Sequence, residues 1–278
     1  MIRLLVGVVS LMPAMALAQD ATEIHPYLGN RYFASIGIFR PDQEMRLGLD
    51  ASVELPDPGP TPYLDFSETF DFKTSDQTFS AEIGWRFRDN WQLRGQYFDI
   101  ENNNRLALEG DIEWGDYTFN AGTVVGAGTD MQITRLFFGR TFWSTNSREF
   151  GLGIGGHILD MAAYVNGNAM LNGQNAGFRQ ERASISQPLP NFGAWYMHAL
   201  SRNWAATLRL DWLSASVGNY DGRIVNAAAS VGYAIGDHFG VSLAYNHFEI
   251  ALDIDDADWH GRAKVRFDGP YISLTGYW

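Results

Sequence analysis

Cysteine is absent from this chain of 278 residues, and basic residues are few. A chain without cysteine has no disulfide scaffold and no thiolate-ligated zinc module. Lys and Arg together number 20 against 32 for Asp and Glu, so the formal net charge is -12. Proteins that bind a phosphate backbone need an excess of basic side chains, and nucleic acid is therefore not an expected partner. Aromatic residues make up 14% of the chain, which is too many for a disordered polypeptide.

Long apolar segments are also scarce. Beyond the first eighteen residues, no uncharged apolar run reaches the roughly 20 residues that a transmembrane helix needs. The first eighteen have the features of a secretory signal peptide, because Arg3 is the only charge before Asp20 and an apolar run leads to the cleavable sequence Ala16-Leu17-Ala18. We expect residues 1–18 to be a cleaved leader and residues 19–278 to be one mature domain. A permanent single-pass anchor, the alternative, would need a longer apolar run.

The mature part of the chain has a hydrophobic period of two. From Arg31 onward apolar and polar residues alternate, and Gly, Asn, Asp and Ser clusters recur at intervals too short for ordinary helices. The alternation is clearest in residues 79–87, 204–212 and 239–246, where one apolar row and one polar row lie on opposite faces. The sequence therefore predicts an all-β fold. Alternation alone does not separate a soluble β-sandwich from a membrane β-barrel.

Turn lengths favour the barrel. Four short connections are each followed by an aromatic residue that opens the next strand, namely Trp91, Phe150, Trp204 and Phe239. Aromatic rings at a common height are typical of a membrane interface. The other connections are longer, at residues 51–75, 103–128 and 166–188 and near 217–222 and 253–261. Short turns that alternate with long loops are typical of an outer-membrane barrel, with the short turns in the periplasm.

Ten strands are predicted, at residues 31–50, 76–88, 91–102, 129–143, 149–165, 189–200, 204–216, 223–235, 239–252 and 262–278. Eight or twelve are alternatives, because Pro41 interrupts the first strand and residues 111–121 suggest an extra hairpin. The apolar row changes parity at residues 246–247 and 268–270, where we expect β-bulges or bends. The predicted fold is a single transmembrane, antiparallel, up-and-down β-barrel with both chain ends in the periplasm.

The C-terminus has the pattern of an assembly signal. The chain ends in an amphipathic strand with an aromatic last residue, and the residues concerned are Tyr271, Leu274, Tyr277 and Trp278. This pattern resembles the C-terminal signal of bacterial outer-membrane barrels, which the barrel-assembly machinery recognises. The resemblance implies export, insertion by that machinery and residence in a bacterial outer membrane, among lipid and lipopolysaccharide.

A wider resemblance covers most of the mature chain. The chain is similar to small bacterial outer-membrane β-barrels in the grouping that includes the OmpA and OmpW types. The segments that carry this resemblance are residues 111–119, 188–190, 220–222, 245–248 and 268–271. These segments are specific to an architecture, and the resemblance implies no substrate.

Charged residues on the polar face of the strands are expected to point into the barrel, since the face opposite the lipid is the lumen. The parity of the strands predicts these lumen residues: Glu82, Arg86, Arg94, Gln96, Arg135, His157, Arg209 and Asp211. Two interpretations stay open. Either the charges form a salt-bridged plug in a closed barrel, or they form a constriction that selects small solutes. The plug predicts arginines locked in pairs, and the channel predicts a wet path past Arg94, Arg135 and Arg209.

Catalysis is a competing class of function. His247 with Glu249, and His260 near the acidic run that precedes it, are candidate acid-base groups at the outer rim. We find no match to the His-Ser-Glu arrangement of lipid A deacylases or to the Asp and His pairs of omptin-type proteases. A histidine beside acids in a loop is more often solvated surface, so the protein is not predicted to be an enzyme.

The outer loops contain two further candidates. The carboxylates of Asp253, Asp255, Asp256 and Asp258 suit Ca²⁺ or Mg²⁺, although a solvated acidic loop is the simpler interpretation. Residues 166–178 carry no charge and suggest a mobile surface loop. No cofactor is expected and a monomer is favoured. A barrel that acts through its outer loops remains an alternative to a structural barrel or a narrow channel.

Overall fold

The computed structural model describes residues 24–49, 64–72, 77–88, 90–217, 220–256 and 259–278. The expected leader at residues 1–18 and its cleavage site lie outside this part of the chain. The helices of the described residues are short, α1 (Pro26–Gly29) and α2 (Phe66–Thr69), and the other elements are strands. Within the described ranges, no helix is long and apolar enough to cross a membrane.

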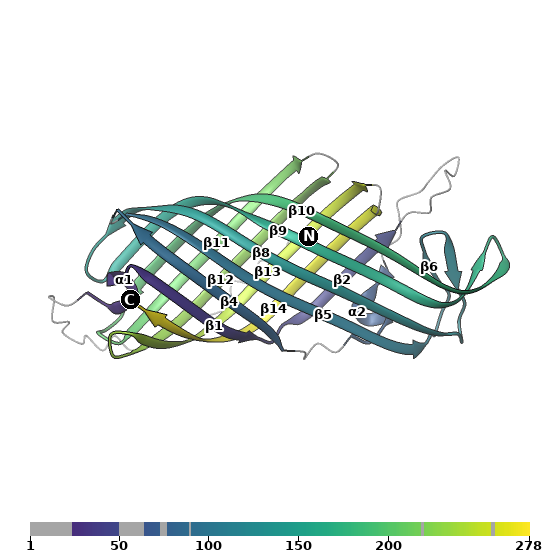
Figure 1. Ribbon diagram of the computed structural model, residues 1–278, viewed down its shortest axis with the longest axis horizontal. Helices are drawn as coiled ribbons and strands as arrows, with labels where there is room; N and C mark the ends of the chain where they lie inside the picture. Colours follow the sequence, from purple (N-terminus) through teal and green to yellow (C-terminus); the bar gives the residue numbers. More distant parts are fainter. Residues whose placement is uncertain (1–23, 50–63, 73–76, 89, 218–219, 257–258) are drawn as a thin grey trace, which may run out of the picture.

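The strands form a closed antiparallel barrel (Figure 1). Neighbours along the chain pair with each other, and the last strand pairs back with the first, with Tyr277 opposite Phe33. The bounds are β1 (Tyr32–Phe39), β2 (Asp42–Leu49), β4 (Thr78–Phe87), β5 (Trp91–Ala107), β8 (Val124–Ser144), β9 (Arg148–Leu171), β10 (Gln174–Ala199), β11 (Trp204–Val217), β12 (Tyr220–Ile235), β13 (Phe239–Asp256) and β14 (Trp259–Tyr277). Since β1 and β2 are two parts of one barrel strand, the predicted ten-stranded, all-β barrel is confirmed.

Among the described residues, three short strands lie outside the ten-strand wall. The strand β3 (Leu64–Asp65) pairs with β2. The strands β6 (Ile112–Trp114) and β7 (Tyr117–Phe119) form the extra hairpin that the sequence suggested, and β7 joins β9 where Thr118 lies opposite Met170.

The four connections that precede Trp91, Phe150, Trp204 and Phe239 lie at one end of the barrel, together with the C-terminus; we call this the turn end (Figure 1). Aromatic rings gather on the outer surface there. Tyr32 stacks between Trp85 and Trp278, with ring centroids 6.3 and 6.4 Å away, and Trp91 stacks on Phe138 at 4.9 Å. The opposite end, which we call the far end, is reached by the longest strands, β9 with 24 residues and β10 with 26.

The predicted bulges at residues 246–247 and 268–270 are wrong. The register between β13 and β14 runs without a shift, from Phe239 opposite Gly276 to Asp256 opposite Trp259. Register shifts occur instead between Asn175 and Gly177 and between Thr141 and Trp143. The apolar residues change from odd to even positions in the sequence because the outward face changes from apolar to polar along each continuous strand, while the inward face changes from polar to apolar.

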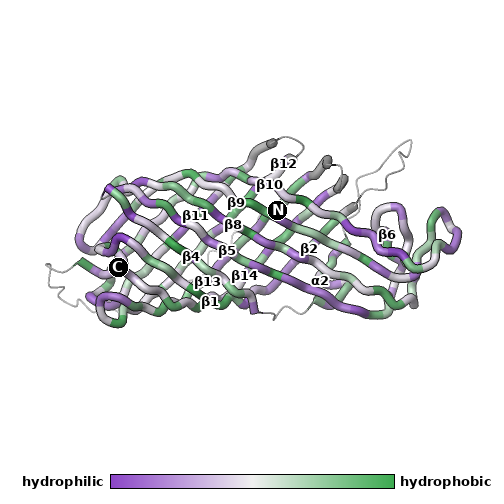
Figure 2. Tube along the Cα trace, in the orientation of Figure 1, coloured by the Kyte–Doolittle hydropathy of each residue, from purple (hydrophilic) through white to green (hydrophobic). Residues whose placement is uncertain are grey.

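Strand β13 illustrates this exchange. Near the turn end its outward residues are Phe239, Val241, Leu243 and Tyr245, and farther along they are His247, Glu249, Ala251 and Asp253. Its inward residues change in the opposite sense, from Ser242, Ala244 and Asn246 to Phe248, Ile250 and Leu252. Figure 2 shows apolar and polar residues alternating along the strands. The turn-end half is therefore apolar outside and polar inside, and the far half is the reverse.

The outer surface of the turn-end half is a continuous ring of exposed apolar side chains, which we call the apolar belt. It includes Ile36, Ile38, Phe79, Ile83, Leu93, Leu136, Leu152, Ile154, Phe192, Leu208, Leu210, Trp212, Leu243, Ile272 and Leu274. A soluble β-sandwich would bury residues 79–87 against residues 204–212. Ile83 is instead 63% exposed and Trp212 52% exposed, so the sandwich alternative is wrong.

The far half encloses an apolar core. Its buried residues come from opposite walls and include Met131, Ile133, Leu159, Met161, Val165, Ile185, Met45, Leu47, Ile224, Phe248, Ile250, Val265 and Phe267. Phe66, Phe70 and Phe72, on and after α2, and Trp114 and Phe119, on the β6–β7 hairpin, complete it. The sequence suggests a mobile loop at residues 166–178, and this expectation is wrong. These residues form the ends of β9 and β10 and the two-residue turn that joins them.

Two prolines explain why the barrel wall divides in the far half. Backbone N–H groups along a strand point alternately to its two neighbours. The Ala199 N–H donates to Ser147 O on the β9 side, so the N–H groups of even-numbered β10 residues point toward β11. Pro188 and Pro190 occupy such positions and have no N–H to donate to β11. The β10–β11 ladder accordingly ends where Phe192 lies opposite Trp212.

A second division follows from the interrupted first strand. The β1–β4 ladder ends where Phe39 lies opposite Thr78, and beyond Pro41 the chain continues as β2, which pairs with β14 and β3. The segment around α2 closes this second seam, since the Asn104 side chain on β5 donates to Phe70 O at 2.7 Å. The far half is thus two sheets around one core, β5-β8-β9-β10 and β11-β12-β13-β14-β2.

We predict that Ile250→Ala destabilises the protein by about 2 to 5 kcal/mol, because Ile250 is 1% exposed within the far core. The matched control is Glu249→Ala on the outer face of the same strand, which removes an ion pair with Arg223 and costs under about 1 kcal/mol. Urea titration of the protein refolded in lipid vesicles measures both. Equal effects of the two substitutions would contradict the assignment of the inner face.

Candidate functional site

The polar lumen of the turn-end half holds the charged residues singled out by the sequence. All lie on inward-facing positions, on β4 (Glu82, Arg86), β5 (Arg94), β8 (Arg135), β9 (His157) and β11 (Arg209, Asp211). Hydroxyl and amide side chains surround them, among them Ser35, Gln92, Gln96, Asn246, Ser273 and Thr275, which are buried. The lumen is therefore a polar interior enclosed by an apolar outer surface.

A buried ion pair crosses the lumen at its deepest level. Arg135 donates from Nε and from Nη2 to the two carboxylate oxygens of Asp211, and both distances are 2.8 Å. The two side chains are 1% and 0% exposed. The guanidinium also lies over the Phe137 ring, and Asn226 donates to Asp211 at 3.4 Å. A bidentate pair of this kind fixes both side chains, because planar fork geometry leaves each little freedom.

A second ion pair lies nearer the turn end. Arg86 Nη1 is 2.9 Å from Glu149 Oε2, and the buried Trp195 indole donates to Glu149 Oε1 at 2.6 Å. Inward-facing glycines on β8 and β9 make room for these groups. A Cβ on Gly151 would lie 2.1 Å from the Trp195 ring, so the Gly-x-Gly repeat of β9 is what admits a large ring from β10.

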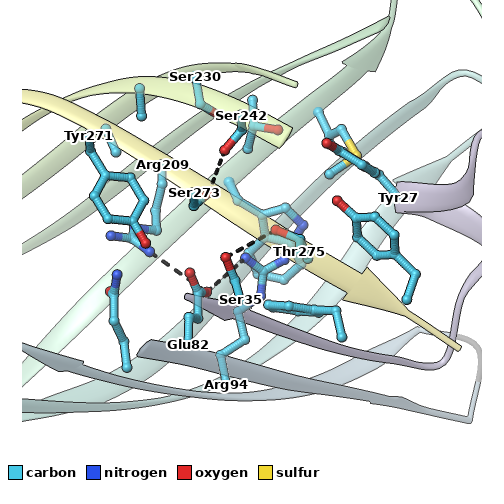
Figure 3. A pocket seen from close by; sticks show the side chains of 18 of the residues that line it. Tyr27, Ser35, Glu82, Arg94, Arg209, Ser230, Ser242, Tyr271, Ser273 and Thr275 are labelled. Atoms are coloured by element: carbon cyan, nitrogen blue, oxygen red, sulfur yellow. Dashed lines mark hydrogen bonds and ion pairs between the residues drawn. The ribbon is translucent and has the colours of Figure 1, made fainter. Parts of the chain in front are cut away.

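The third charged group is loosely packed. Glu82 Oε1 lies 3.8 Å from Arg94 and 3.9 Å from Arg209, which are beyond hydrogen-bond distance (Figure 3). Arg94 also lies over the Phe33 ring at 5.3 Å. One carboxylate thus serves two arginines, and none of the three is held as tightly as Arg135.

Residues 25–30, which precede β1, pack against the barrel wall at the turn end of the lumen. Tyr27 of α1 packs on Tyr277, with ring centroids 4.7 Å apart, and Arg86 donates to Leu28 O at 2.8 Å. Burial lowers the pKa of His25, so its ring is neutral and Nδ1 accepts a hydrogen bond from the Tyr27 N–H at 3.2 Å. The charged network therefore also anchors the N-terminal segment.

At the far end the lumen meets the apolar core. Phe248 packs beside His157, with ring centroids 6.0 Å apart, and Phe267 stacks against Phe248 at 6.2 Å. A cavity lined by polar lumen residues lies on the turn-end side of this layer. A wet path past Arg135 is thus interrupted by a buried ion pair and then by a packed hydrophobic layer.

The other residues singled out by the sequence are dispersed. Tyr271 and Tyr277 face the lumen, whereas Leu274 and Trp278 are 49% and 58% exposed on the outer face. His247 lies on the outer surface and contacts Asp268, not Glu249.

The acidic run near the far end is described only in part. Asp253 is exposed and lies 3.4 Å from Arg262, while the side chains of Asp255, Asp256 and Asp258 and of His260 lie outside the described residues. In the ranges that the structure describes, no group of three or more His, Cys, Asp or Glu residues is arranged to hold a metal ion.

Sequence reasoning missed Glu149, Trp195 and Asn226, which complete the network. Glu149 opens the predicted strand at residues 149–165, directly after a short turn, and is not among the lumen residues predicted from the sequence. Its parity, two residues before Gly151 and in phase with His157, places it inward and is the signal that identifies it.

The barrel has counterparts among solved outer-membrane proteins, at low identity. The chain is similar to the outer membrane protease OmpT from Escherichia coli, with 9% identity and a TM-score of 0.45 over 89% of this chain and 96% of that one. It is similar to the Pseudomonas putida toluene transporter TodX, with 8% identity and a TM-score of 0.35 over 88% and 89%. It is also similar to Ail, the attachment invasion locus protein of Yersinia pestis, with 9% identity and a TM-score of 0.33 over 89% and 97%.

These similarities assign no activity to this chain. A protease, a transporter and an attachment protein stand side by side among them, so whether this chain is an enzyme is not established. No family model and no curated protein matches the chain.

We predict that Asp211→Asn costs about 3 to 5 kcal/mol of stability, because it leaves the buried Arg135 without its counter-ion. Replacing both residues, as Arg135→Met with Asp211→Leu, is expected to recover most of this loss. Asp130→Asn, which breaks an exposed pair with Arg182, serves as the control and costs under about 1 kcal/mol. If the double substitution in urea titration is as unstable as the single one, the penalty does not come from an unpaired charge.

Proposed function

We propose that this protein is an integral β-barrel of a bacterial outer membrane with a closed lumen, which acts through the part that stands outside the membrane. The apolar belt is the observation that carries this proposal. Side chains such as Ile83 and Leu243, 63% and 62% exposed, form a ring around a polar interior. A hydrocarbon layer is the solvent in which such a surface is favourable, and a closed barrel leaves no unpaired edge within it.

The closed lumen favours a structural or surface-interaction barrel over a channel. Arg135 is locked in a pair with Asp211, and the apolar core lies beyond it. A solute on this path would have to break a buried charge pair and then displace a packed hydrophobic layer, and both steps are costly. The turn end and the chain ends are then periplasmic, and the far end faces the exterior.

The far half is suited to interaction outside the cell. Strands β9 and β10 have 24 and 26 residues, more than twice the roughly 9 to 11 that cross the hydrocarbon layer. The excess encloses the far core, so the described strands that extend beyond the membrane are supported by buried apolar contacts. The same proposal has four further parts. The barrel contacts lipid and lipopolysaccharide, is assembled by the barrel-assembly machinery, is a monomer, and belongs to the OmpA and OmpW grouping.

A hydrolase at the outer rim is less favoured by the geometry. His247 lies on the outer face next to the belt and contacts Asp268, which Arg266 also holds at 2.9 Å. A histidine engaged in this way on a convex surface has no enclosed site in which to act on a substrate.

We predict that Leu243→Arg impairs membrane insertion, because a charge on the lipid face of a barrel costs roughly 2 to 4 kcal/mol near the midplane. His247→Arg, four residues along the same outward row but beyond the belt, is the control and is expected to insert as the unaltered chain does. The fraction that refolds into phospholipid vesicles, measured as the heat-modifiable band on a gel, tests this. Equal refolding of both variants would argue against lipid as the solvent of the belt.

We predict that the refolded protein is electrically silent in a planar bilayer, and that Arg135→Ala is silent too. The reason is that the far core still seals the lumen when the ion pair is removed. Insertion is verified separately by protection from protease, and a porin in the same bilayer is the positive control. Discrete openings of the unaltered chain that change in Arg135→Ala would instead support a channel with Arg135 at its constriction.

A further inference from the structure

A cavity of about 160 Å³ lies inside the turn-end half of the barrel. Its walls extend from Tyr27 and Asn30 beside α1 to Glu82, Arg94 and Arg209 in the middle of the lumen (Figure 3). Hydroxyl groups line the opposite side, where the Ser242 and Ser273 hydroxyls bond to each other at 2.7 Å and Thr275 donates to Ser35 at 3.0 Å. The cavity is therefore polar and has arginines on one side.

The charges around this cavity do not balance. The inward-facing charged residues described at this level are four arginines and three acids: Arg86, Arg94, Arg135, Arg209, Glu82, Glu149 and Asp211. Two arginines are matched one to one, Arg135 by Asp211 at 2.8 Å and Arg86 by Glu149 at 2.9 Å. One carboxylate then remains for two guanidinium groups, an excess of one positive charge.

The excess is located at Arg94 and Arg209. Their side chains are 13% and 12% exposed, and both are 3.8 Å or more from Glu82. Arg209 Nε is buried and finds no acceptor among the described residues, and the same holds for the acceptor atom Gln96 Oε1. Arginine stays protonated in proteins, so the charge cannot be relieved by losing a proton. Water satisfies hydrogen bonds but does not neutralise a buried cation.

We propose that the cavity binds one small monovalent anion, a halide or a planar oxoanion such as nitrate or a short carboxylate, held between Arg94 and Arg209. The anion matches the excess of one charge and supplies the acceptor that Arg209 Nε lacks. It enters from the turn end past α1, because the Arg135–Asp211 pair and the far core close the other side. This ligand lies inside the barrel wall and is independent of any partner at the outer rim.

Two substitutions change the charge balance in opposite directions. Glu82→Gln raises the excess to two positive charges and is expected to bind the anion at least threefold more tightly. Arg209→Gln leaves Arg94 matched by Glu82 and is expected to weaken binding at least tenfold. Arg94→Gln is a second variant that is expected to weaken anion binding in the same way. Arg182→Gln on the outer surface removes the same charge and is the control, with no expected change in anion affinity.

The experiment measures thermal unfolding of the full-length barrel in vesicles while nitrate replaces gluconate at constant ionic strength, since gluconate is bulkier and more strongly hydrated than nitrate and competes less for a site between two guanidinium groups. Ligand that binds only the folded state raises the unfolding temperature with concentration, which gives an apparent Kd. The expected order of affinity is Glu82→Gln, then the unaltered chain and Arg182→Gln together, then Arg209→Gln and Arg94→Gln. An unchanged response in the Arg209 and Arg94 variants, or no response in the unaltered chain, would overturn the proposal.

A measurement on the unaltered chain needs no variant. Crystals grown in bromide are expected to give an anomalous peak between the Arg94 and Arg209 guanidinium groups. A cavity without that peak, or bromide confined to the protein surface, would overturn the site. The result does not depend on whether the barrel conducts or on what binds its rim.

Discussion

Closure of the backbone hydrogen-bond ladder at the level of the apolar belt is the constraint on which the rest of the structure depends. A strand edge exposed to hydrocarbon would leave N–H and C=O groups without partners, at a cost of several kcal/mol each. The ladder from β1 through β14 and back to β1 is accordingly complete where the outer surface is apolar. The two seams, beyond Pro41 and beyond Phe192, begin only where the outward residues become polar and water can serve unpaired groups.

This closure sets the chemistry of the interior. Where lipid covers the outside, alternation places the polar row in the lumen, and the charges there must find partners inside a narrow space. Arg135 with Asp211 and Arg86 with Glu149 do so at 2.8 and 2.9 Å, and Arg86 also ties the N-terminal segment to the wall. Where water covers the outside, the same alternation places the apolar row inside, and the far half is stabilised by a hydrophobic core as in a soluble protein.

The two halves therefore divide the functional possibilities. The Arg135–Asp211 pair and the far core interrupt the lumen, which is why the proposed function is a surface-interaction barrel and not a channel. The far core and the long β9–β10 hairpin support the far end, where the proposed function places contact with a partner. The excess positive charge in the lumen is proposed to bind a small anion and has no part in binding that partner.

The sequence by itself determined the alternating pattern, and with it the fold class, the ten strands, the break at Pro41 and the inward position of residues such as Arg135 and Asp211, because side-chain direction in a strand follows parity alone. The extra hairpin near residue 114 was equally visible. The exchange of inside and outside chemistry at residues 246 and 269 was misread as bulges, because a change of face and a change of environment look alike in one strand. Only the tertiary structure decided which charges meet. Pairing across a lumen depends on which strands stand opposite each other, and that is fixed by closure and register of the whole sheet rather than by any single segment.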